Sequence, residues 1–225
     1  MAIIKTENLE ITVKKNGSSV HFITEHGRFY ATRGNKKVKV PVISAGPAGE
    51  CPNASICEFS HLNYKEAGTS ICYAFKAERI YPSVKKARYA NETVLRALHE
   101  AGHDYEFGKV VGKVMAELAH KMEVKFLRFN ESSDLSGWNI KFFQGVSNAA
   151  IAEGVKPYTY SKSSQHLVKK LTNLGVTVQI SQDDFVVVED AAEAEERGLV
   201  VCPGEECGTK CTRCMFNLKT AVIRH

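Results

Sequence analysis

The second half of this chain alternates between helical and strand patterns, and that alternation limits the folds open to it. Apolar residues recur at helical spacing over 82–101 and again over 107–121. An apolar strand pattern follows at 124–129, and helix and strand patterns then alternate as far as residue 201. Strands that alternate with long helices are typical of parallel βαβ units. We therefore expect an α/β fold, either a partial (βα) barrel or an open, mostly parallel sheet.

The N-terminal segment has a different pattern, of short alternating strands separated by turn residues. The expected strands are residues 9–13, 20–23, 28–32 and 38–40. Asn16-Gly17 is a hairpin signal between the first two. This pattern predicts an antiparallel β extension. We expect one domain with four parts: a β extension over 1–43, a cysteine-bearing loop rich in Gly, Pro and Ser over 44–81, the helix and strand alternation over 82–201, and a cysteine-rich segment over 202–225.

Seven cysteines form two groups that are far apart in the sequence. They are Cys51, Cys57 and Cys72 in the first group, and Cys202, Cys207, Cys211 and Cys214 in the second. A thiolate is a soft ligand suited to zinc and to iron–sulfur clusters. Several thiols at short spacings, in a chain without an export signal, favour metal binding over disulfides. We predict a metal site assembled from both groups.

The spacing of the second group favours an iron–sulfur cluster over zinc. The two sulfurs of Cys211-x2-Cys214 can reach one ion or one cluster. Structural zinc usually has two CxxC pairs, and this group has one. We expect a [4Fe-4S] or [3Fe-4S] cluster. Zinc in its place and thiols without metal are the alternatives, and the seven cysteines also permit a cluster together with zinc at a second site. The C-x3-C-x2-C spacing also matches radical S-adenosylmethionine enzymes, but those carry the motif early in the chain, so we interpret the match as coincidence.

Polar residues follow the expected strands at their carboxyl ends, where parallel sheets place their sites. They are Asn130 to Asp134, Ser161 and Lys162, Ser181 to Asp183, and Cys202. We expect them at one rim of one sheet. Glu131, Asp134 and Lys162 are the candidate catalytic residues because such groups can act as acids or bases. Asp134 alternatively caps a helix that begins near Ser136.

Charge and hydropathy set the expectations for partners and location. The net charge is +5, and residues 1–100 hold 15 Lys and Arg against 9 Asp and Glu. The basic cluster Arg79, Lys85, Lys86 and Arg88, interleaved with tyrosines, is interpreted as an exposed helix face, with a nucleic-acid contact as the alternative. No apolar run is long enough to cross a membrane, and the start lacks a signal peptide. We expect a cytoplasmic monomer that does not contact a membrane.

An ordered set of short motifs gives the chain a resemblance to a known family. The motifs are CPNASIC, CYAFKAERIYPSVKKARYAN, FLRFNESSDLSG, PYTYSKS, VCPGEECGTKCTRC and VIRH. Together they cover residues 40–225 and resemble the phage and plasmid "gene product 88" family. The family's SGD motif is here Ser132-Ser133-Asp134, and 14 residues separate Cys57 from Cys72 where the family has them close together.

The resemblance implies a phage or mobile-element origin and a partial barrel, similar to that of radical enzymes, that holds an iron–sulfur cluster. It implies that Ser133 and Asp134 contact the cofactor. The expected function is a phage-encoded iron–sulfur protein with a redox, regulatory or host-interaction role in the host cytoplasm. The alternatives are a cluster-dependent enzyme, similar to radical S-adenosylmethionine enzymes, that acts on a small molecule, and a zinc-stabilised nucleic-acid-binding protein. A host protein or a nucleic acid is the expected partner.

Overall fold

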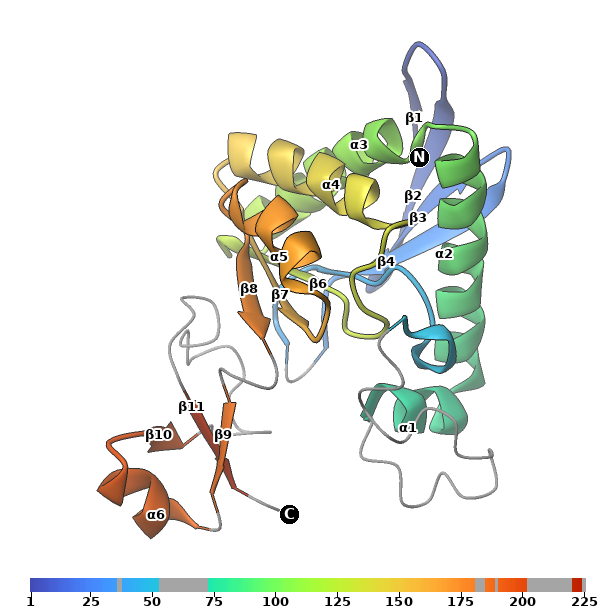
Figure 1. Cartoon of the computed structure of the whole chain (residues 1–225). Coiled ribbons are helices and arrows are strands. Elements are labelled where there is room, and N and C mark those ends of the chain that lie inside the picture. Colours follow the sequence, from blue (N-terminus) through green and yellow to red (C-terminus); the bar gives the residue numbers. More distant parts are fainter. Residues whose placement is uncertain (36–37, 53–72, 181–184, 189, 202–219, 224–225) are drawn as a thin grey trace.

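The computed structural model describes residues 1–35, 38–52, 73–180, 185–188, 190–201 and 220–223. Two sheets are present among these residues (Figure 1). The larger sheet has eight strands in the order β1-β2-β3-β4-β5-β6-β7-β8, and the smaller has three in the order β10-β11-β9. No helix in the described part of the chain has the length and apolar character needed to span a membrane.

The first five strands of the large sheet form an antiparallel meander. They are β1 (Ala2–Lys5), β2 (Glu10–Asn16), β3 (Ser19–Thr24), β4 (Gly27–Thr32) and β5 (Val42–Ile43). The predicted hairpin between β2 and β3 is confirmed, and Gly17 in its turn has a φ of +54°, a conformation that favours glycine. The expected N-terminal antiparallel β extension is therefore present.

The predicted strand at residues 38–40 is wrong, because the chain pairs with β4 only from Val42 onward. The backbone N–H of Val38 donates to Oδ1 of Asn35 at 2.8 Å, and the N–H of Asn35 donates to the carbonyl of Val38 at 2.8 Å. These bonds make a turn where a strand was expected. Val40 is buried against Tyr158 instead of lying in a strand.

The remaining strands of the large sheet run parallel to β5. They are β6 (Phe126–Phe129), β7 (Lys156–Ser161) and β8 (Thr177–Ile180). The intervening helices are α4 (Ile140–Ala152) and α5 (Gln165–Thr172). β5 is antiparallel to β4 and parallel to β6, so the strand pairing of the sheet changes from antiparallel to parallel at β5. The predicted α/β class, with parallel strands that alternate with helices, is confirmed.

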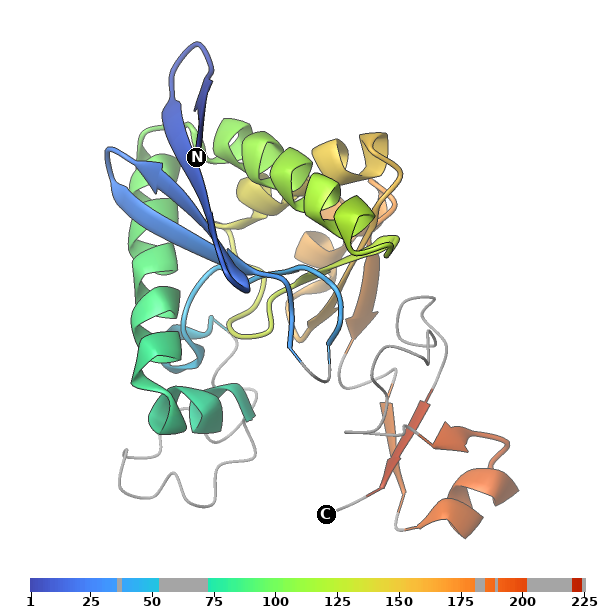
Figure 2. The ribbon, with the colours of Figure 1, turned by 180° about the vertical axis from the view of Figure 1, so that it is seen from behind.

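Three further helices precede β6 in the chain. They are α1 (Tyr73–Ile80), α2 (Pro82–Glu100) and α3 (Asp104–Lys121). Figures 1 and 2 show α2 running alongside the antiparallel strands and α3 and α4 lying over the parallel ones. A cluster of buried rings, Phe22, Phe29, Phe107 and Phe142, joins β3 and β4 to α3 and α4. This cluster is the centre of the hydrophobic core.

The expected loop over residues 44–81 contains regular structure in its described parts. A 3-10 turn, η1 (Ala48–Glu50), precedes Cys51, and α1 occupies residues that the Gly, Pro and Ser content had suggested were loop. Two nonlocal contacts stabilise α1. The carbonyl of Ala74 accepts a hydrogen bond from Arg88, and Glu78 is buried against the same guanidinium. Composition alone does not reveal such contacts.

The small sheet contains β9 (Phe185–Val188), β10 (Val200–Val201) and β11 (Thr220–Ile223), all parallel. The helix α6 (Ala191–Glu196) connects β9 to β10, and the side chain of Asp190 caps it by accepting from the N–H of Glu193. The figure shows this unit beyond the end of β8, apart from the large sheet (Figure 1). The expectation that the strand before Cys202 shares a rim with β6 and β7 is therefore wrong.

Candidate functional site

The loops that follow β6 and β7 meet at the carboxylate of Asp134. Its Oδ1 accepts the hydroxyl of Ser161 at 2.6 Å and the N–H of Leu135 at 2.7 Å. Its Oδ2 accepts the N–H of Lys162 at 2.7 Å. Asp134 is buried, so these charge-assisted bonds are shielded from water. The predicted meeting of these two loops at one rim is confirmed, and Asp134 joins them.

The segment between Asp134 and α4 is a turn closed by Asn139. The side-chain amide of Asn139 donates to the carbonyl of Asp134 at 2.8 Å, and its Oδ1 accepts the N–H of Ser136 at 2.9 Å. These bonds fix residues 134–139, so α4 begins at Ile140 and not near Ser136. The alternative that Asp134 caps this helix is therefore wrong.

The same rim supports the segment that leads to Cys51. The hydroxyl of Ser132 donates to the carbonyl of Gly46 at 2.7 Å, and Oδ1 of Asn130 accepts the N–H of Ala45 at 3.2 Å. The amide of Asn91 on α2 donates to the carbonyl of Ser44 at 2.8 Å. Three side chains from distant parts of the chain thus hold the backbone of residues 44–46.

A buried ion pair continues this support to η1 and α1. Nη1 of Arg88 lies 2.9 Å from Oε1 of Glu78 and donates to the carbonyl of Ala74 at 3.0 Å. The same Oε1 accepts the N–H of Ala48 at 2.8 Å. The side chains of Arg88 and Glu78 are only 7% and 3% exposed. Nη2 of Arg88 lies 3.7 Å from the carboxylate of Glu131, so the pair also reaches the rim.

The interpretation of Arg88 as part of an exposed basic face is wrong. Lys86 and Arg79 are exposed, whereas Arg88 is buried. Sequence reasoning missed Glu78 and Asn91 as well. The only available signal was that Arg88 occurs at helical spacing from Asn91 and Leu95, on the side of α2 that faces the sheet. An arginine on a buried helix face needs an acidic partner, and Glu78 meets that need.

The candidate residues Glu131 and Lys162 belong to the same two loops as Asp134 and Ser161. Oε1 of Glu131 accepts from the side-chain amide of Asn35 at 3.1 Å, and its side chain is 25% exposed. The backbone N–H of Lys162 is bonded to Asp134, and its residue is partly buried. The predicted polar residues at 181–183 lie outside the described residues.

The loop after β6 also holds two strained residues with unpartnered polar atoms. Asn130 and Ser133 have φ values of +48° and +65°, a region that residues other than glycine rarely adopt. Nδ2 of Asn130 and Oγ of Ser133 are buried and have no hydrogen-bond partner in the described structure. Strained backbone of this kind gathers at functional sites. Two donor groups at the carboxyl end of a parallel strand are therefore available to a ligand.

Comparison with protein families matches the Gene product 88 family over residues 12–221. The chain belongs to the Gene product 88 family. The match includes the rim loops and both cysteine groups, and it begins earlier than the motifs suggested, in β2. Comparisons with curated proteins and with solved structures find no match.

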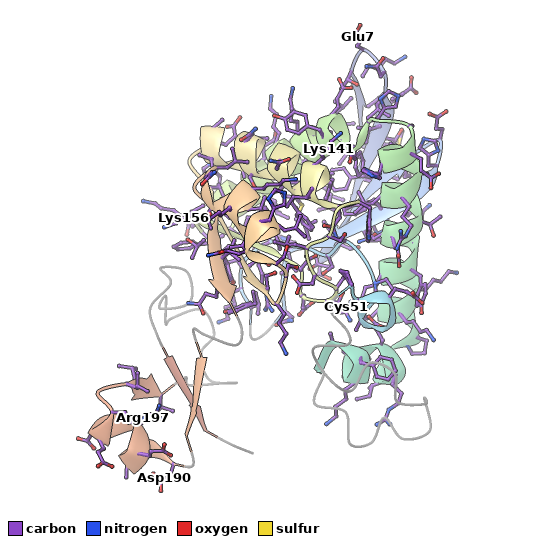
Figure 3. The ribbon with its side chains drawn as sticks, viewed as in Figure 1. Glu7, Cys51, Lys141, Lys156, Asp190 and Arg197 are labelled. Carbon is purple, nitrogen blue, oxygen red and sulfur yellow. The ribbon has the colours of Figure 1, made fainter. Side chains whose placement is uncertain are left out.

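Of the seven cysteines in this Gene product 88 protein, Cys51 lies within the described residues, and the other six lie outside them. Cys51 follows η1 directly, and its N–H donates to the carbonyl of Ala48 at 3.2 Å. It is partly buried and lies at the rim end of the molecule (Figure 3). The described residues contain no group of three or more His, Cys, Asp and Glu that could hold a metal ion.

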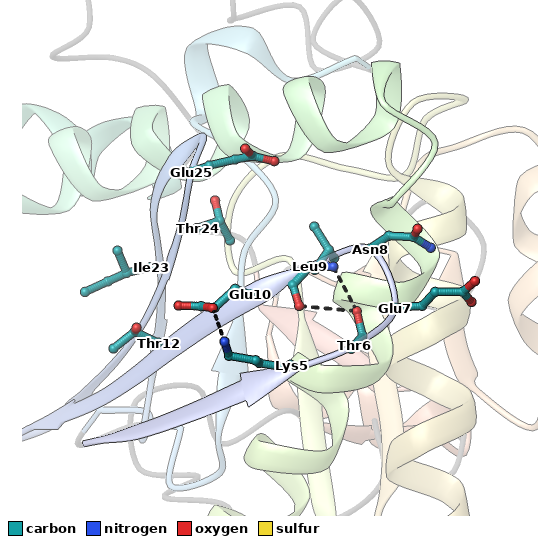
Figure 4. A pocket seen from close by; sticks show the side chains of 10 residues that line it. All are labelled: Lys5, Thr6, Glu7, Asn8, Leu9, Glu10, Thr12, Ile23, Thr24 and Glu25. Atoms are coloured by element: carbon teal, nitrogen blue, oxygen red, sulfur yellow. Dashed lines mark hydrogen bonds and ion pairs between the residues drawn. The ribbon is translucent and has the colours of Figure 1, made fainter.

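A shallow hollow of about 540 Å³ lies at the other end of the molecule, beside the turn between β1 and β2 (Figure 4). It is lined by Lys5 to Glu10 and by residues of β2, β3 and the following turn. An exposed ion pair of 2.8 Å between Lys5 and Glu10 crosses it. None of the candidate residues lines this hollow, so it is separate from the rim.

Proposed function

We propose that this Gene product 88 protein binds an iron–sulfur cluster beside the rim of the parallel strands and acts as a phage-encoded redox or regulatory protein. Cys51, Cys57 and Cys72 from the first group, with one or more of Cys202, Cys207, Cys211 and Cys214, would be the ligands. The donor set fits the group, since all seven donors are thiolates, the ligands that iron–sulfur clusters take. A bound cluster would supply one-electron chemistry.

The position of Cys51 is the observation that carries this proposal. Metal ligands need supporting contacts that fix their orientation. Three residues before Cys51, the N–H of Ala48 is bonded to the buried carboxylate of Glu78. Two residues earlier still, the carbonyl of Gly46 is bonded to Ser132. Buried charges that fix the backbone next to Cys51 favour a role for its thiol as a metal ligand over an unliganded thiol in an exposed loop.

The test is purification without oxygen, followed by absorbance, iron and sulfide measurements. We expect brown protein with absorbance near 400 nm, and X-ray absorption at the iron edge should detect bound iron. Cys51→Ser and Cys202→Ser should each lower the iron content, while Ser83→Ala on the exposed start of α2 should not. Colourless, metal-free wild-type protein that is folded would contradict the proposal. Zinc in place of iron would favour the zinc-stabilised alternative.

A second candidate function is cluster-dependent chemistry on a small molecule at the same rim. The strained residues Asn130 and Ser133, with their unpartnered donor atoms, favour it because they offer hydrogen bonds to a ligand. S-adenosylmethionine should then change the spectrum of the reduced cluster, and Ser133→Ala should weaken that change. An unchanged spectrum removes this candidate.

The partner is a host protein or a nucleic acid in our proposal. Nucleic-acid binding would weaken steeply as salt rises, because it depends on contacts to phosphates. Titration of labelled single-stranded and double-stranded DNA at two salt concentrations tests it. Absence of binding at low salt leaves a host protein as the proposed partner.

A further inference from the structure

Arg88 is placed to hold both ends of the segment that carries the first three cysteines. The segment begins at Cys51, three residues after Ala48, and its last cysteine precedes α1 directly in the sequence. Arg88 bonds the carbonyl of Ala74, in the first turn of α1, at 3.0 Å. Through Glu78 it also holds the N–H of Ala48. One guanidinium therefore contacts the backbone at Ala74 directly and the backbone at Ala48 through Glu78, on the two sides of residues 53–72 in the sequence.

The chemistry of the contacts indicates a positioning device. The desolvation of two buried charges can offset their mutual attraction, so we infer that this pair is retained for its geometry and not for stability alone. Nη1 of Arg88 bonds both the carbonyl of Ala74 and the carboxylate of Glu78, while Nη2 faces Glu131. The ammonium group of lysine is a single point charge and cannot occupy both nitrogen positions of this planar group. The guanidinium also lies 3.7 Å from Glu131, which relates both anchor points to the rim.

We propose that Arg88 is a positioning residue for the metal ligands: it acts through Glu78 on Cys51 and through Ala74 on the start of α1. This inference rests on the proposed function, because it requires a metal bound by the first cysteine group. Groups that hydrogen-bond directly to metal ligands change metal affinity by about 10–100-fold when they are replaced. Arg88 acts one step further out, through Glu78 and Ala48, so we expect an effect at the lower end of this range. The proposal assigns to Arg88 no contact with the metal.

The test measures metal affinity and stability separately. The cluster is assembled with iron and sulfide in the absence of oxygen in wild type, Arg88→Lys and Glu78→Gln. The iron retained against a competing chelator is then measured, and thermal unfolding is recorded with and without the cluster. The matched control is Arg96→Lys, on the same helix, whose ion pair of 2.6 Å with Glu92 is half exposed at the arginine and includes no hydrogen bond to Ala48 or Ala74 in the described structure. Glu78→Gln keeps an acceptor for Ala48 and serves if Arg88→Lys fails to fold.

We expect Arg88→Lys and Glu78→Gln to lower the iron affinity about tenfold or more, and Arg96→Lys to leave it within twofold. Iron should also raise the unfolding temperature less in these two variants than in wild type, since binding to the folded state stabilises it. Variants that melt at lower temperatures but bind iron as wild type does would show a purely structural role and overturn this inference alone. Wild-type protein that takes up no iron would overturn the proposed function as well.

Discussion

The hydroxyl of Ser161 donates to the carboxylate of Asp134 at 2.6 Å, and this bond joins the loops that follow two neighbouring parallel strands. The oxygen of Ser161 also accepts the N–H of Ser163 at 3.0 Å, and the hydroxyl of Ser163 donates to the carbonyl of Leu135 at 2.7 Å. The rim is therefore a connected network. The Asp134 carboxylate accepts hydrogen bonds from its own loop, at Leu135, and from the next loop, at Ser161 and Lys162. It therefore acts as a tie between the two loops.

Asp134→Asn should destabilise the protein by about 2 kcal/mol. The amide group of asparagine would face a donor on at least one side, and a buried donor would be left unsatisfied. Urea unfolding measures the change. The matched control is Asp190→Asn, because Asp190 accepts a single backbone N–H as a helix cap and asparagine caps equally well. Equal stability of Asp134→Asn and wild type would contradict the role of Asp134 as a tie.

Gly108→Ala should destabilise the protein through the contact between α3 and α4. A Cβ at Gly108 would overlap the carbonyl of Phe142, and one at Gly145 would overlap the carbonyl of Tyr105. The two helix backbones thus approach closely at glycines. Overpacking costs about 1–3 kcal/mol or more, and it should exceed the gain of about 1 kcal/mol in helix propensity. Gly137→Ala is the control, since a Cβ there meets no atom within 4 Å; thermal unfolding that ranks the two variants the other way would refute this packing.

Stability should fall in acid partly because of His21. Burial, and then the positive charges of Arg28 and Lys14, lower the pKa of His21 below its ordinary value of 6.5. The imidazole of His21 is therefore protonated at a higher pH in the unfolded chain than in the folded chain. Its contribution to the free energy of unfolding is complete above about pH 6.5 and is lost as the pH falls below that value.

His21→Gln should lose less stability than wild type between pH 7.5 and pH 5, as measured by urea unfolding at several pH values. The imidazole of His21 lies 3.0 Å from the hydroxyl of Ser19, and a glutamine amide can keep this contact. Replacement of the exposed His166 by glutamine controls for the loss of one imidazole. Parallel pH profiles of wild type and His21→Gln would rule out this contribution.

Gln179→Met should raise the free energy of unfolding by about 1 kcal/mol. Gln179 on β8 is fully buried, and neither atom of its amide has a partner in the described structure. Burial of unbonded polar groups costs about 1–3 kcal/mol, and methionine has a similar length without them. Gln165→Met, at the exposed start of α5, is the control. A clear loss of stability in Gln179→Met would mean that the amide has a partner, either a ligand or a residue outside the described ranges.

Local patterns in the sequence were sufficient for most elements of the fold. Pro82 begins α2 as its position in the first turn predicted, and the helix ends before Ala101-Gly102. The alternation of strands and helices after residue 124 predicted the parallel half of the sheet, and Asn16-Gly17 marked the hairpin between β2 and β3. These features depend on neighbours a few residues apart, which the sequence shows directly.

Tertiary contacts decided the rest. The sequence could not show that β10 pairs with β11 in a second sheet, because strand pairing is chosen between segments far apart in the chain. It showed Arg88 as one of several basic residues, and only the fold buries this one against Glu78, where the low dielectric makes an unpaired charge too costly. The sequence by itself determined which residues can supply thiol ligands and which local elements form, because both depend on residue type and near neighbours. The tertiary structure decided which charges are buried, and hence how the segment that leads to Cys51 is held.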